Sequence, residues 1–247
     1  ATTRLWLMPD AGTLPRPSRR DEAWRYADAA FLAEAPLETL HSWRDLEIAA
    51  GQIHRVLLVE SEDGGPIQRL RVSVGEGGRF EAFAVLSGGP YQRIELEVTL
   101  ARGAHFEFGG VTIGGGNGTN EFVTRTIHAE PEATSNQIVR AVHWGKATGS
   151  FLGEIKVVRD AQKTDAAQDF KGLLLERGAS ANAVPQLEIF ADDVKCAHGA
   201  TVGQMDESAR YYMAARGIPP ELAQRLLVQA FIGDALVELD DEEERTR

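Results

Sequence analysis

Short apolar runs separated by glycine-containing breaks dominate the chain between residues 52 and 205. In several runs apolar and polar positions alternate strictly, and this two-residue period is typical of β-strands. No segment in this region has the spacing of an amphipathic helix. A stretch of about 150 residues with short strands and no helices predicts a sandwich, a barrel or a β-solenoid. The clearest runs are residues 54–60, 68–74, 93–100 and 153–158.

Short segments of weakly similar sequence recur along this region, and they favour the β-solenoid among these folds. Segments at Asp160, Gly178 and Gly199 each place small residues beside an apolar run, and they recur 18 and 21 residues apart. A weaker pair of segments, at Glu76 and Arg102, lies 26 residues apart. A coil of two or three short strands with its turns needs about that many residues at ~3.3 Å per residue. We therefore predict a mainly β chain built on a parallel β-helix, with a sandwich as the alternative.

A helical pattern precedes the strand-rich region. Residues 18–32 predict a short helix that Ser18 caps. Trp24, Ala27 and Phe31 fall on one face of this helix at helical spacing.

The C-terminal part predicts two further helices. Residues 206–217 begin with an aspartate N-cap and end with a glycine. Residues 219–237 begin with two prolines, which the first turn of a helix tolerates. We expect three parts: a helical or irregular segment over 1–50, the β-helix over 51–205, and a helical region with an acidic tail over 206–247.

The composition narrows the classes of function. The formal net charge is −11, whereas a protein that binds bulk nucleic acid usually carries a basic surface. A single cysteine excludes an internal disulfide and fits a reducing compartment. The N-terminal apolar run is broken by Pro9 and Asp10, which makes it too short for a signal sequence or a membrane span. We expect a cytoplasmic protein that binds neither nucleic acid nor membrane.

The single cysteine, Cys196, lies two residues before His198. On a strand, residues i and i+2 face the same side about 7 Å apart, which is too far for a direct thiol–imidazole hydrogen bond but allows a shared external ligand. A buried strand end is the simpler alternative, because free cysteines are commonly buried. A closed zinc or iron–sulfur site usually needs four donors, mostly thiolates. With one thiol, this chain can hold such a centre only if another chain, or histidines and carboxylates, complete it.

The other motifs give little indication of a chemical function. The sequence has no Ser/His/Asp motif, no HExxH helix and no P-loop, so we assign no catalytic residue. The glycine-rich stretch 113–120 predicts a hairpin or a corner. We expect His128 at a surface or corner, and we expect His143 to pack against Trp144.

Residues 185–206 closely resemble the SufD members of the SufB/SufD family, which are scaffold proteins of the Suf machinery for iron–sulfur cluster assembly. The resemblance implies a right-handed parallel β-helix flanked by helical ends. This agrees with the fold predicted from the strand pattern. The likeness continues at residues 20–26, 151–157, 161–166, 173–175, 211–218 and 230–231.

The resemblance also implies a complex with two partners. SufD-like and SufB-like chains pair through their β-helices, and both dock C-terminal helices on the ATPase SufC. A transient iron–sulfur cluster is thought to form at the SufB/SufD junction, near the histidine of the family's Lys-Cys-x-His-Gly motif. That histidine is His198 here, and Cys196 is a secondary candidate ligand. The expected docking residues are Tyr211, Leu222, Leu226, Leu227, Ala230 and Phe231.

Two departures shape the functional hypothesis. Glu132 stands where a second family histidine is expected, and Gly199 stands where SufB-type chains carry a glutamate. We therefore expect a SufD-like subunit without catalytic activity rather than the main cluster-bearing chain. Flavin binding and a homodimer of this chain alone are left open. The alternatives are a β-helix polysaccharide lyase or hydrolase and a self-assembling structural β-helix.

Overall fold

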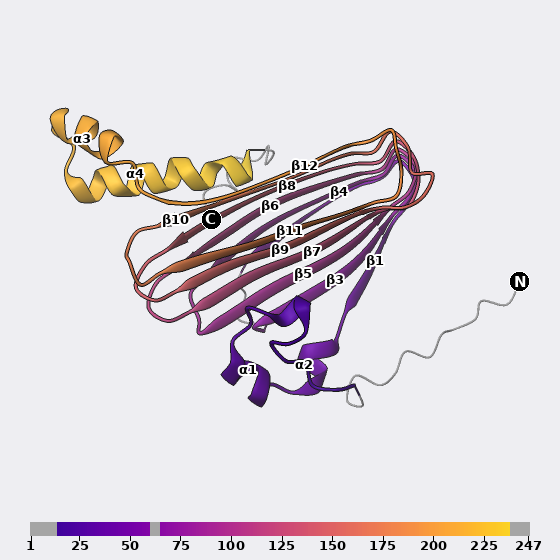
Figure 1. The fold of residues 1–247 in the computed structure, drawn as a ribbon, viewed down its shortest axis with the longest axis horizontal. Coiled ribbons are helices and arrows are strands. Elements are labelled where there is room, and N and C mark those ends of the chain that lie inside the picture. Colours follow the sequence, from indigo (N-terminus) through magenta and orange to yellow (C-terminus); the bar gives the residue numbers. More distant parts are fainter. Residues whose placement is uncertain (1–13, 60–64, 238–247) are drawn as a thin grey trace, which may run out of the picture.

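The computed structural model describes residues 14–59 and 65–237 and shows two six-stranded parallel sheets that face each other (Figure 1). Successive strands alternate between the sheets, so the chain winds as a β-solenoid. This confirms the predicted fold and excludes the sandwich. Sheet A runs β1 (Arg44–Ile48), β3 (Ile67–Val74), β5 (Tyr91–Leu100), β7 (Thr119–His128), β9 (Thr148–Val157) and β11 (Ser180–Ile189). Sheet B runs β2 (Ile53–Val59), β4 (Arg79–Ser87), β6 (His105–Gly114), β8 (Thr134–His143), β10 (Asp165–Leu174) and β12 (Lys195–Gln204).

The spacings of 18 and 21 residues between the more similar segments do not equal one coil, whereas the 26-residue spacing of the weaker pair does. Arg79 pairs with His105, so the 26-residue spacing is one full coil of two strands and two corners. Asp160 and Gly178 lie in successive corners, and Gly199 lies inside β12. The spacings of 18 and 21 residues therefore mark about half a coil, since each coil crosses both sheets. Within the stretch 113–120, residues 115–118 form the corner between β6 and β7, in agreement with the predicted hairpin or corner.

The core fills the space between the two sheets with side chains from alternate strand positions. Phe80 and Phe106, on neighbouring strands of sheet B, stack at 5.6 Å between ring centroids. Phe151 of sheet A and Phe170 of sheet B stack at 6.2 Å further along. All four rings are buried, and burying each one contributes roughly 1.5–3 kcal/mol. The in-register pairing of parallel strands is therefore fixed by a continuous apolar interior.

The corner that leads from sheet A to sheet B has left-handed backbone in the first five coils. Gly51, Gly77, Gly103, Glu132 and Lys163 all have φ between 62° and 68°. Their backbone N–H groups donate to the carbonyl oxygens of the next coil, which stacks the corners. Glycine adopts this conformation without steric cost, whereas other L-residues lose about 1–2 kcal/mol. Glu132 is thus a corner residue with a backbone role.

The N-terminal segment is less helical than predicted. It forms η2 (Glu22–Trp24), α1 (Ala29–Glu34) and α2 (Leu37–His41) instead of one helix over 18–32. Asp28 caps α1 by accepting from the Phe31 N–H, while Ser18 bonds to Asp21. The residues between these two caps form turns and η2 instead of one continuous helix. The predicted apolar face still forms, since Trp24 is buried and Phe31 packs beside it.

This N-terminal segment is held on sheet A by a buried charge cluster. The Arg93 guanidinium is fully buried, lies 4.0 Å from the Trp24 ring centroid, and pairs with Glu95 at 2.9 Å. It also lies 3.3 Å from Glu121, which accepts a hydrogen bond from the Tyr91 hydroxyl at 2.6 Å. In Figure 1 these helices lie against the sheet that contains β3 and β5.

The two predicted C-terminal helices form, although the second ends at Gly233 and not at residue 237. They are α3 (Glu207–Ala215) and α4 (Pro220–Gly233), followed by the short turn η3 (Asp234–Leu236). The Asp206 side chain caps α3 by accepting from Ser208 N–H, and Gly217 follows in the left-handed conformation. In the part of the chain that the structure describes, no helix has the length and apolar character needed to cross a membrane.

Candidate functional site at the end of the solenoid

The last coil leaves one end of the solenoid uncovered. Strands β11 and β12 are the final strands of sheets A and B, and within the described residues no strand pairs with their outer edges (Figure 1). Val202 of β12 is 48% exposed, although its in-register partner Gly172 in β10 is buried. The inner face of the last coil is therefore open. Unpaired strand edges are ready templates for another strand.

Cys196 and His198 both lie on this uncovered inner face. Cys196 pairs in register with buried Ala166, and His198 pairs with buried Gln168. Side chains at in-register positions of parallel strands point to the same side. The His198 side chain is exposed, whereas Cys196 is half-buried and packs beside Ala191. The structure therefore brings the two predicted residues to one surface that a ligand or a partner can reach.

The two side chains differ chemically. Burial raises the pKa of the Cys196 thiol, and the nearby carboxylate of Asp165 raises it further. Cys196 is therefore a protonated thiol at neutral pH, and a metal must displace its proton before binding. A neutral imidazole binds metal directly through one ring nitrogen. The exposed imidazole of His198 has no such cover.

This pair does not make a complete metal site. Over residues 14–59 and 65–237, no three His, Cys, Asp or Glu side chains are grouped so that they could hold one metal ion. A tetrahedral site would need at least two further donors.

The two faces of α4 have different environments. Leu222, Leu226 and Ala230 follow one another at four-residue intervals and are exposed. Leu227 and Phe231 instead line a groove of about 350 Å³ between α4 and the strands β10 and β12. Of the six predicted docking residues, these two therefore partly pack within the chain.

Tyr211, the remaining predicted docking residue, lies on α3, beyond the ends of the strands. Tyr211 is 78% exposed, and the neighbouring Tyr212 is 59% exposed with Arg216 over its ring. Figure 1 shows α3 projecting past the ends of the strands. Two exposed aromatic rings on a projecting helix are typical of a protein–protein contact.

An ion-pair cluster that the sequence pattern did not indicate ties the C-terminal region to sheet B. The buried guanidinium of Arg140 in β8 lies 2.6 Å from Asp169 of β10 and 3.2 Å from Asp234 of η3. Asp169 is the in-register partner of Gly199, the residue after His198. Gly109 lets η3 approach the sheet, because a Cβ there would collide with the Ala235 carbonyl oxygen. These contacts link residues 94 positions apart, so no local pattern could reveal them.

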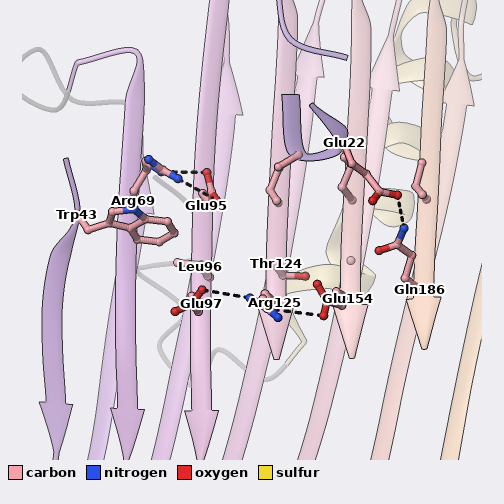
Figure 2. A pocket seen from close by; sticks show the side chains of 15 residues that line it. Glu22, Trp43, Arg69, Glu95, Leu96, Glu97, Thr124, Arg125, Glu154 and Gln186 are labelled. Atoms are coloured by element: carbon pink, nitrogen blue, oxygen red, sulfur yellow. Dashed lines mark hydrogen bonds and ion pairs between the residues drawn. The ribbon is translucent and has the colours of Figure 1, made fainter. Parts of the chain in front are cut away.

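A second hollow lies on the outer face of sheet A, beside η2 (Figure 2). Its volume is about 380 Å³, and Val123 and Leu152 form part of its floor. The charged side chains along its rim already pair with each other. Arg125 bridges Glu97 and Glu154, at 3.8 and 3.2 Å (Figure 2). We therefore assign no ligand to this hollow.

Both histidines of β7 and β8 lie inside the solenoid. The prediction of a surface or corner position for His128 was wrong, because it is fully buried and its Nε2 lies 3.0 Å from the Ser135 hydroxyl. His143 is also buried, with Nε2 3.0 Å from the Thr112 hydroxyl. Burial lowers the pKa of each imidazole to about 4. They are neutral core residues.

The sequence of the solenoid matches a known family. Residues 50–231 match the model of the SufBD core domain, described as part of the SUF system for FeS cluster assembly. The chain belongs to the SufB/SufD family. This confirms the resemblance found in residues 185–206.

Named relatives support the same conclusion. The chain is 38% identical over 115 residues to the iron–sulfur cluster assembly protein SufD of Escherichia coli, which covers 47% of this chain and 27% of the relative. It is 35% identical over 129 residues to SufD of Bacillus subtilis, and the aligned region covers 52% of this chain and 30% of the relative. It is 31% identical over 178 residues to a SufBD family protein of Synechocystis, and the aligned region covers 72% of this chain and 39% of the relative. The chain thus spans well under half the length of these relatives.

Proposed function

We propose that this SufB/SufD-family chain is a SufD-like subunit of a SufBCD-type complex, without turnover of its own. Its role is to complete a cluster-assembly site together with a SufB-like subunit. The observation that carries the proposal is the exposed His198 on the uncovered inner face of the last coil. Family membership favours this role over the glycan-enzyme and filament alternatives.

The open end supplies the features that a β-helix partner needs. Unpaired edges of β11 and β12 offer backbone hydrogen bonds to added strands, and the exposed inner face offers Val202 for burial. A partner seated there would bring its own donors next to His198 and Cys196. The growing cluster is the cargo of this site, and the ligand count requires that the two chains share it.

The C-terminal helices are proposed to dock the SufC-like ATPase. Tyr211, Leu222, Leu226 and Ala230 form the exposed part of this contact, and Leu227 and Phe231 support it from the groove side. The Arg140–Asp234 ion pair would carry displacements of η3 into sheet B. A cytoplasmic location, expected from the single cysteine, stays a prediction.

The test is a His198→Ala variant in a reconstituted complex with SufB-like and SufC-like partners. We expect the complex to assemble normally and the yield of iron–sulfur cluster to fall at least tenfold, measured by anaerobic absorption spectroscopy. The matched control is His54→Ala, since His54 is an exposed histidine on β2 at the other end of sheet B. An undiminished cluster yield in the His198→Ala complex would refute the proposal.

A further inference from the structure

A column of polar side chains leads from the open end into the solenoid. Gln137 of β8, Gln168 of β10 and His198 of β12 occupy the same register on the inner face of sheet B. The next position in the column, on β6, is the buried Phe108. The inner row therefore changes from apolar to polar as it approaches the uncovered coil.

Gln168 is the unusual member of this column. Only 3% of the residue is exposed, and neither its Oε1 nor its Nε2 has a hydrogen-bond partner. Across the interior it lies against Gly153, where a Cβ would come within 2.9 Å of both amide atoms. A buried polar group without a partner typically costs about 1–3 kcal/mol. An apolar residue of the same size would avoid this cost, so the amide needs a reason to be there.

None of the buried neighbours of Gln168 bonds to its amide. Gln137, on the deep side, is already engaged, because its Oε1 accepts from Thr124 at 2.6 Å and its Nε2 donates to Thr126 at 3.2 Å. On its own strand, the adjacent inner-face residues are Ala166 and Phe170, which are apolar. His198 is the polar neighbour on the open side.

We propose that Gln168 is the positioning residue for His198. In-register side chains on neighbouring strands lie about 4.8 Å apart at the backbone, so a glutamine and a histidine on the same face are within reach. The Gln168 Oε1 would accept a hydrogen bond from one ring N–H of His198. The other ring nitrogen is then unprotonated and presented towards the open end. Metal-binding histidines commonly have their second nitrogen fixed by such an acceptor.

This proposal rests on the role of His198 stated above, and it explains why a buried, unpartnered amide lies directly behind that residue. Gln168 touches neither cargo nor partner in this account. It selects the tautomer of His198 and limits its rotation, so that the donor nitrogen is prepared before a partner chain covers the end.

The test reads the imidazole itself, in the full 247-residue chain with ¹⁵N-labelled histidine. Long-range ¹H–¹⁵N spectra at a pH where imidazoles are neutral report the tautomer, and a His198→Ala spectrum assigns the signal. We expect a single tautomer for His198 in the unmodified chain and loss of that signature in Gln168→Met. Gln204→Met, which removes a glutamine on β12, the strand of His198, should leave it unchanged.

Thermal unfolding separates positioning from a structural role. Methionine removes the proposed hydrogen bond to the exposed His198, but it also removes the cost of burying an amide, so the melting temperature of Gln168→Met should stay close to that of the unmodified chain. A mixture of tautomers in the unmodified chain would overturn the proposal without any variant. A lower melting temperature with an unchanged His198 signal would also overturn it. Because no partner is present, either failure is distinct from failure of the cluster-yield test.

Discussion

At the residue scale, the difference between Cys196 and His198 comes from their surroundings, although both occupy inner-face positions of one strand. The apolar cluster around Ala191 covers the thiol, and the carboxylate of Asp165 lies near enough to disfavour a second negative charge. His198, two residues further along, lies beyond that cover.

The raised pKa of Cys196 predicts slow alkylation. Only the thiolate reacts with iodoacetamide, so at pH 7.5 Cys196 should react at least severalfold more slowly than an exposed cysteine. Asp165→Asn should speed the reaction, because it removes one cause of the raised pKa. The measurement is the alkylation rate by mass spectrometry.

A matched control exists on the same strand. Ala197→Cys in a Cys196→Ser background places a thiol at an exposed neighbouring position. Equal rates for the two thiols would show that Cys196 is not shielded.

At the element scale, β8, β10 and η3 are joined through the side chain of Arg140. Its guanidinium is nearly fully buried, whereas Asp234 is 56% exposed. Removing the arginine would leave Asp169 without its closest partner, while removing Asp234 affects mainly the helical region. Replacing Asp234, the exposed partner, is therefore the better test of the ion pair that joins η3 to sheet B.

Asp234→Asn should loosen α4 without unfolding the solenoid. A partly exposed ion pair contributes up to about 1 kcal/mol, which corresponds to about fivefold faster amide exchange near the end of α4. Exchange in β8 and β10 should not change. The control is Glu221→Gln in the first turn of the same helix. Identical exchange rates in both variants would rule out a clamp at Asp234.

Local signals predicted the elements better than they predicted the contacts between them. The Asp206 cap, Gly217 and the prolines that begin α4 act within a few residues, and the predicted helices match the structure. Strand alternation likewise placed Cys196 and His198 on one face. The positions of Gln168 and Arg140 depend on pairing between strands about 30 residues apart, which the sequence pattern does not specify.

At the scale of the whole molecule, the solenoid is a stack with a mainly apolar interior, in which one inner row of sheet B becomes polar towards the last coil. His128 and His143 are held neutral inside it, with pKa values lowered to about 4 by burial. The unfolded chain titrates its histidines near 6.5, so between pH 6.5 and 4 it binds protons that the folded chain does not. These two residues therefore make the folded state less stable as the pH falls through this range.

His143→Gln should reduce this loss of stability. Each buried histidine contributes a decrease of roughly 3 kcal/mol in the free energy of unfolding between pH 6.5 and pH 4, from about 2.5 units of pKa difference. Urea unfolding at several pH values should show a flatter curve for the variant. His54→Gln, at an exposed position, should follow the unmodified chain. Parallel curves for His143→Gln would contradict a neutral buried His143.

The central claim is that the uncovered last coil is where a SufB-like partner binds. Hydrogen–deuterium exchange of the chain, alone and with that partner, tests it most directly. We predict that backbone amides of β11 and β12 gain protection when the partner is added, while those of β1 and β2, the edge strands at the other end, exchange as before. Protection confined to β1 and β2, or no protection in β12, would contradict the account.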